Sequence, residues 1–174
     1  MRTLSRPSLG NRNRRGAGGS MTDRAKLCVL VVERNPYDIN IIKRAMRSSE
    51  AGWEAQYALD GEEALDALAQ KGQSGTMPSP ALILIDINLP KINGLEVLSR
   101  IKEDDRLRRI PIVILAVSER EEDMVKAYEL GAATYMMKPV DAEQLTQLLE
   151  TVKDYWKIAG RSAEQTRAAD TTDL

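Results

Sequence analysis

The chain has 174 residues, of which 43% are hydrophobic and 29% charged, and its formal net charge is −1. This balance is typical of one ordinary domain with short tails, and it gives no indication of nucleic acid or an anionic membrane as the main partner. The longest apolar run is far shorter than the roughly 18 residues that cross a bilayer, and the N-terminus lacks a signal-peptide pattern, so we expect a cytoplasmic protein.

Residues 1–24 form a basic segment that we expect to be disordered. The first twenty contain five arginines and no acid among Gly, Ser, Pro and Asn, a composition that cannot bury a core. Met21 opens the sequence Met-Thr-Asp and is an alternative start. Residues 25–157 are predicted to form a single domain. We expect residues 158–174 to be a second disordered tail, too short for another folded unit.

Between these tails, short apolar runs alternate with segments of helical period, which is the pattern of an α/β protein with a mostly parallel sheet. Five strands are predicted, over residues 27–32, 53–58, 81–85, 110–115 and 133–137. Each is followed by a predicted helix, beginning near Asn35, Asp60, Asn93, Glu119 and Asp141 in turn. Gly131 is expected to end the fourth helix, and the fifth ends near Trp156. Residues 71–80 are rich in Gly, Ser and Pro and are predicted to be a surface loop.

Charged residues follow three of the predicted strands directly. Glu33 and Arg34 follow the first strand, Asp86 ends the third, and Lys138 follows the fifth. Because the carboxyl ends of parallel strands meet at one edge of the sheet, these side chains are expected to converge. Taken alone, Asp86 would more often be a helix cap and Lys138 a solvated lysine. There is no histidine, so any histidine chemistry must come from a partner.

Four motifs carry a resemblance to a known family: Val32-Glu-Arg-Asn-Pro-Tyr-Asp38, Asp86-Ile-Asn-Leu-Pro90, Tyr128-Glu-Leu-Gly-Ala132 and Lys138-Pro-Val-Asp141. Over roughly residues 26–156 the chain resembles the receiver domain of two-component response regulators, in particular the stand-alone receivers of phytochrome-type histidine kinases. The resemblance implies a flavodoxin-like, doubly wound sheet of five parallel strands in the order 2-1-3-4-5, with five helices. It also implies a single-domain signalling protein that is not an enzyme.

By the same resemblance, Asp86 is the phosphoryl acceptor of a phosphorelay and Lys138 neutralises the added charge. Glu33, Asp86 and the backbone carbonyl of Asn88 would hold Mg²⁺, but Arg34 stands where a second metal-binding acid is usual. Exchanging −1 for +1 about 5 Å from a divalent ion costs on the order of 3 kcal/mol, so we expect weak Mg²⁺ binding. Two orientations of Arg34 remain open: its guanidinium either binds the Asp86 carboxylate or points into solvent.

A second departure concerns the switch that reports phosphorylation. Ala116 occupies the position of a Thr or Ser whose hydroxyl normally binds the phosphoryl group, and alanine has no donor. Tyr135 matches the aromatic residue that moves with that hydroxyl. Ser118 is an alternative hydroxyl, although strand alternation does not bring it as close.

Two other functions remain as alternatives. One is a receiver-fold adaptor that acts without phosphorylation. The other is a flavodoxin-like nucleotide or flavin module, against which stand the missing Walker A motif and the missing Gly-rich loop after the first strand. A colourless protein would exclude the flavin. The expected partners are a histidine kinase and a second copy of the chain, the latter through Met124–Leu130, Ala133–Met137 and Leu145–Trp156.

Overall fold

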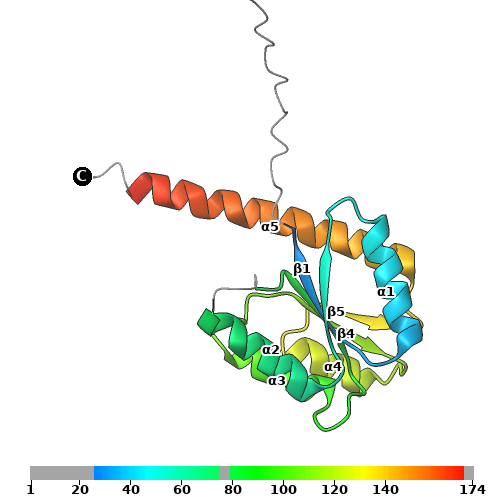
Figure 1. Ribbon diagram of the computed structural model, residues 1–174. Helices are drawn as coiled ribbons and strands as arrows, with labels where there is room; N and C mark the ends of the chain where they lie inside the picture. The colour runs from blue at the N-terminus through cyan, green and yellow to red at the C-terminus, as the bar shows by residue number, and fades with distance from the viewer. Residues whose placement is uncertain (1–25, 75–78, 171–174) are drawn as a thin grey trace, which may run out of the picture.

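The computed structural model describes residues 26–74 and 79–170. A five-stranded, fully parallel sheet lies at its centre, in the order β2-β1-β3-β4-β5, so the predicted sheet order is confirmed (Figure 1). The strands are β1 Cys28–Val32, β2 Glu54–Ala58, β3 Leu82–Asp86, β4 Ile112–Ala116 and β5 Thr134–Met137. The predicted basic segment 1–24 lies outside the described residues.

Helices cover both faces of the sheet. They are α1 Pro36–Ser48, α2 Gly61–Ser74, α3 Gly94–Glu103, α4 Glu121–Glu129 and α5 Ala142–Asp170. One apolar core joins the sheet to α2, α3 and α4, and a second joins it to α1 and α5. Strands β1, β3 and β4 are buried along their whole length, as central strands covered on both sides must be. None of the described helices is long and apolar enough to span a membrane.

Side-chain caps explain where α1, α2, α3 and α5 begin, whereas α4 begins without a side-chain cap. Asn35 accepts a hydrogen bond from the N–H of Tyr37 at 2.9 Å, and Asn93 accepts one from the N–H of Glu96 at 2.9 Å. Asp60 and Asp141 cap α2 and α5 in the same way, through N–H groups three residues later. Gly131, with φ of 99°, follows α4 in the left-handed region.

Gly94 allows the chain to turn back closely beneath the end of β3. A Cβ atom at this position would lie 2.3 Å from the backbone oxygen of Asp86 and 2.8 Å from Cα of Ile87. The N–H of Gly94 donates to the carbonyl of Ile87 at 2.9 Å, which fixes the turn. The absence of a side chain at Gly94 therefore helps to set the position of Asp86.

Several predicted boundaries differ from the structure. Strands β1, β4 and β5 begin one or two residues later than predicted, and β3 is shifted by one residue towards the C-terminus. Strand β2 begins at Glu54, one residue after Trp53. Helix α2 continues to Ser74, so the predicted loop at 71–80 is helical over its first four residues, while residues 75–78 lie outside the described part. Helix α5 continues to Asp170 and does not end near Trp156, so the expected tail from 158 is helical as far as the structure describes it (Figure 1). Helix α5 runs past Trp156 and through Gly160, where the flanking residues are mostly good helix formers.

Candidate functional site

Three buried carboxylates surround one ammonium group at the carboxyl edge of the sheet. The Nζ of Lys138 lies 2.5 Å from Oε2 of Glu33, 3.1 Å from Oδ2 of Asp86 and 3.2 Å from Oδ2 of Asp38. All four side chains are less than a tenth exposed. We refer to these four residues as the acceptor cluster. Three carboxylates and one ammonium give it a formal charge of −2.

Sheet hydrogen bonds place the residues of the acceptor cluster. The N–H of Glu33 donates to the carbonyl of Ala58 at 3.1 Å, which extends the pairing of β1 with β2 by one residue. The N–H of Lys138 donates to the carbonyl of Ala116 at 2.7 Å, which does the same for β5 and β4. Asp86 is the last residue of β3 and is in register with Leu115. The predicted convergence of Glu33, Asp86 and Lys138 is thus present in the structure.

Backbone N–H groups hold one oxygen of each strand-end carboxylate. Oε1 of Glu33 accepts hydrogen bonds from the N–H groups of Arg34 at 3.0 Å and Asn35 at 2.9 Å. Oδ1 of Asp86 accepts one from the N–H of Asn88 at 3.0 Å. The remaining oxygen of each carboxylate is thereby directed at Lys138, and both carboxylates are fixed in orientation before any ligand arrives.

Burial and ion pairing act in opposite directions on these groups. Burial lowers the pKa of Lys138, but its hydrogen bonds and charge interactions with Glu33 and Asp86 outweigh that effect and raise the pKa above its ordinary value. Burial raises the pKa of Glu33, and the bonds from Lys138 and from the N–H of Asn35 oppose the rise. Lys138 therefore carries its positive charge at neutral pH, where it faces Asp86.

Arg34 points away from the acceptor cluster. The residue is exposed, and within the described part of the chain its guanidinium has no ion pair. Of the two predicted orientations, the structure therefore shows the solvent-directed one, and Lys138 is the cation that contacts Asp86. The long Arg side chain keeps its charge in water, where it avoids the cost of desolvation.

Asp38 belongs to the cluster, although sequence reasoning did not single it out. It lies in the first turn of α1 and is 4% exposed. The available signal was its spacing: Asp38 precedes Ile42 and Ala45 by four and seven residues, which places an acid on the buried face of an amphipathic helix. An acid in such a position requires a partner, and Lys138 provides it.

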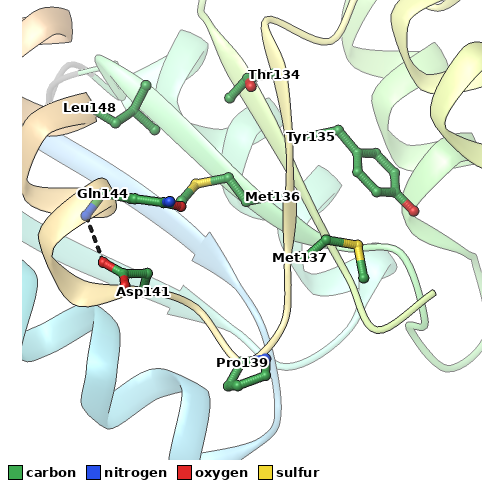
Figure 2. Close-up of a pocket in the computed structure, with 8 residues that line it drawn as sticks. All are labelled: Thr134, Tyr135, Met136, Met137, Pro139, Asp141, Gln144 and Leu148. Atoms are coloured by element: carbon green, nitrogen blue, oxygen red, sulfur yellow. Dashed lines mark hydrogen bonds between the residues drawn. The ribbon is translucent and has the colours of Figure 1, made fainter. Parts of the chain in front are cut away.

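The switch positions Ala116 and Tyr135 lie within β4 and β5. Ala116 is fully buried, and the hydroxyl of Tyr135 donates to the backbone carbonyl of Ser118 at 2.9 Å. The hydroxyl oxygen of Ser118 accepts a hydrogen bond from the N–H of Arg120 at 3.2 Å, so it serves the loop before α4. Figure 2 shows Tyr135 on the opposite side of β5 from Met136 and Leu148. The Tyr135 hydroxyl thus holds the β4–α4 loop by bonding a backbone carbonyl of that loop.

The acceptor cluster has oxygen ligands and negative charge that suit a divalent cation. Carboxylate and carbonyl oxygens are the ligands that Mg²⁺ prefers, and a charge of −2 matches the ion. Oε2 of Glu33 is buried. Among the described residues it accepts no hydrogen bond of normal geometry, and the Lys138 ammonium is its close ionic partner. However, no group of three acids, histidines or cysteines among the described residues has metal-binding geometry. The residues fit Mg²⁺ in donor type and charge, but with few carboxylate ligands.

Comparisons with known proteins agree with this geometry. The family model of the response regulator receiver domain matches residues 29–150. The response regulator Rcp1 from Synechocystis is 34% identical over 128 residues, which cover 74% of this chain and 87% of Rcp1. A crystal structure of the Mn²⁺-bound form of Rcp1 aligns with a TM-score of 0.63 at 34% identity, covering 75% of this chain and 94% of that one.

A second solved structure is similar to the same extent. The phosphorylated cyanobacterial phytochrome response regulator RcpA aligns with a TM-score of 0.65 at 38% identity, covering 76% of this chain and 94% of that one. The family match spans most of the domain, and these relatives are covered nearly end to end. The chain therefore belongs to the response regulator receiver family, and its similarity is to the stand-alone receivers of phytochrome-type systems.

Proposed function

We propose that this chain is a single-domain response regulator in which Asp86 accepts a phosphoryl group from a phosphohistidine of a cytoplasmic histidine kinase. The N–P bond of the phosphohistidine breaks, the imidazole keeps the electron pair, and a bond forms between phosphorus and a carboxylate oxygen of Asp86. The observation that carries this proposal is the 3.1 Å approach of the charged Lys138 Nζ to Oδ2 of Asp86. The chain would act as a phosphoryl carrier and not as an enzyme.

Lys138 would stabilise the transfer by charge. Phosphoryl transfer spreads negative charge over three oxygens, and a preoriented cation in a site with little water stabilises it more strongly than one in bulk solvent. Lys138 is held at this point by the bond from its N–H to Ala116 and by the carboxylates around its ammonium. Its side chain is 7% exposed, so the charge is poorly screened.

Glu33, Asp86 and the carbonyl of Asn88 would hold a weakly bound Mg²⁺. When bound, the ion would neutralise charge on the transferred group. The relative Rcp1 has been crystallised in a Mn²⁺-bound form, which supports divalent-cation binding by this chain. Since Arg34 contributes no carboxylate, the affinity should be low, and Asp86 would be phosphorylated slowly at millimolar Mg²⁺.

The output would also be weaker than in a receiver with a hydroxyl at position 116. Ala116 cannot bind a phosphoryl oxygen, so the loop after β4 would not be pulled towards Asp86. The Tyr135 hydroxyl already holds that loop through the Ser118 carbonyl. This arrangement favours a second candidate function, an adaptor whose surface does not depend on phosphorylation.

Incubation with acetyl phosphate and Mg²⁺ separates the two functions. In the phosphoryl-carrier function, mass spectrometry should show the gain of one phosphoryl group, and the gain should be absent from Asp86→Asn. No gain in the native chain, under conditions that label a conventional receiver, would contradict the carrier and leave the adaptor. A gain that persists in Asp86→Asn would show that another residue is the acceptor.

A homodimer through α4, β5 and α5 is the second part of this proposal. Tyr128 on α4 and Tyr155 on α5 are about half exposed, and aromatic side chains are favoured in interface cores. Between α5 and β5 lies a shallow pocket lined by Met136, Gln144 and Leu148, together with other residues of β5 and the start of α5 (Figure 2). A second copy of the chain could bury these apolar groups.

Light scattering tests the dimer. We expect the native chain to have twice the mass of a single copy at micromolar concentration, and Tyr128→Ser together with Tyr155→Ser to weaken association by about tenfold, a usual cost of losing interface aromatics. Tyr37→Ser is the matched control, because Tyr37 is 65% exposed but lies on α1. A native chain that stays monomeric, or a control that dissociates equally, would contradict this interface.

A further inference from the structure

The buried carboxylate of Asp38 has no part in the phosphoryl transfer described above. Glu33, Asp86 and Lys138 lie at the ends of strands, but Asp38 enters the acceptor cluster from the first turn of α1. Among the residues that the structure describes, its carboxylate pairs with the ammonium of Lys138, at 3.2 Å. A buried acid is costly unless it is paired, so this contact sets the conformation of both side chains.

The geometry makes Asp38 a competitor of Asp86 for Lys138. An ammonium has three N–H donors, and Lys138 is surrounded by three carboxylates from β1, α1 and β3. The two contacts of Nζ, 3.2 Å to Asp38 and 3.1 Å to Asp86, mean that the two Oδ2 atoms are at most 6.3 Å apart. The Lys138 ammonium is thus shared between Asp86, the acceptor at the end of β3, and Asp38, an acid on α1.

Charge at this distance acts on two ligands with opposite sign. A divalent cation beside Asp86 is attracted by the Asp38 carboxylate, whereas a phosphoryl group adds one negative charge and is repelled by it. Asp38 also competes for the Lys138 ammonium with the phosphoryl group that Asp86 would carry after transfer. Asp38 therefore favours binding of the cation, but it opposes the added charge of a phosphoryl group once the cation is in place.

We propose that Asp38 is a positioning residue with opposite effects on the two ligands of the acceptor cluster: it holds Lys138 in the resting arrangement, raises the affinity of the site for a divalent cation and, once that cation is bound, lowers the affinity for a phosphoryl group. This inference rests on the proposed phosphoryl transfer for its functional meaning. The underlying contact between Asp38 and Lys138 can be tested without any phosphoryl donor.

The first experiment compares two ligands on Asp38→Asn, which removes the charge and keeps the side-chain shape. Mn²⁺ affinity, followed by the electron paramagnetic resonance signal of the free ion, should fall about tenfold. Affinity for beryllofluoride at saturating Mg²⁺ should rise about threefold. Both values are those expected for charges about 6 Å apart. A merely structural role would lower both affinities together. A parallel fall, or no change in either, would overturn the proposal.

Glu96→Gln is the matched control. Glu96 occupies the same first-turn position of α3 that Asp38 occupies in α1, but its side chain is about half exposed and pairs with Arg100. It should leave both affinities unchanged. An equal effect of Glu96→Gln would assign the result to acids at helix N-termini in general and contradict a specific role for Asp38.

The second experiment is a double-mutant cycle that needs no ligand. In the native chain Asp38→Asn should lower the urea midpoint of unfolding, because an ion pair is lost. In a Lys138→Met background the same change should raise the midpoint, because an unpaired buried charge is removed. A shift of the same sign in both backgrounds would overturn the contact. If the cycle succeeds but no beryllofluoride binds even to the native chain, the proposed function has failed while the inferred contact stands.

Discussion

Replacing Arg34 with Asp is expected to increase the affinity for Mn²⁺ or Mg²⁺ by on the order of thirtyfold, equivalent to about 2 kcal/mol. The new carboxylate would follow Glu33 directly, at the end of β1, where its backbone N–H already bonds Oε1 of Glu33. A carboxylate about 5 Å from a divalent ion gains about 1.7 kcal/mol even at the dielectric of water, and direct coordination adds to that. The affinity can be measured by titration with Mn²⁺ and competition with Mg²⁺.

The exposure of Arg34 changes the physical reason for weak metal binding. With the guanidinium directed into solvent, its repulsion of the ion is screened, and most of the defect is the missing ligand. Arg34→Ala should therefore increase the affinity for Mn²⁺ by about twofold or less, because it removes only the screened repulsion and adds no ligand. Arg44→Asp, an equal charge change on an exposed residue further along α1, should have little effect.

The three variants give distinct patterns. If Arg34→Ala restored as much affinity as Arg34→Asp, repulsion would be the defect and the missing-ligand interpretation would be wrong. If Arg44→Asp matched Arg34→Asp, general attraction of cations by a more acidic protein would explain the gain. An unchanged affinity in Arg34→Asp would show that position 34 cannot reach the ion.

The fold was predictable because its determinants are local and periodic. Five apolar runs separated by helical segments leave few arrangements other than a wound parallel sheet, and caps such as Asn35 and Asp141 mark where helices begin. The convergence of Asp86 and Lys138 followed from one geometric rule, since parallel strands place their carboxyl ends together. Neither result required knowledge of side-chain conformation.

What could not be predicted depends on rotamers and on residues outside the strand ends. Arg34 has a long side chain that reaches either the crevice or water, and the sequence does not distinguish the two. Asp38 resembles an ordinary first-turn acid that stabilises a helix N-terminus, and its partner Lys138 becomes evident only when α1 is packed against α5 in the folded chain. Burial also depends on packing between elements distant in sequence.

Replacing Lys138 with Met is expected to lower the free energy of unfolding by about 3–5 kcal/mol, the usual cost of removing one partner from a buried ionic group. Glu33, Asp38 and Asp86 would remain buried without a counter-ion. Methionine is an unbranched side chain only slightly shorter than lysine, so loss of packing contributes little. Urea unfolding at neutral pH, followed by circular dichroism, measures the change.

Lys91→Met provides the matched control, because Lys91 also contacts two acids, Asp60 at 3.1 Å and Glu62 at 3.3 Å, but its side chain is 56% exposed. Exposed ion pairs are screened by solvent and contribute little to stability, so the control should unfold almost like the native chain. Equal losses in the two variants would mean that the acceptor cluster is hydrated and not truly buried. In that case Lys138 would be too well screened to stabilise a phosphoryl group, and the argument for transfer to Asp86 would lose its electrostatic basis.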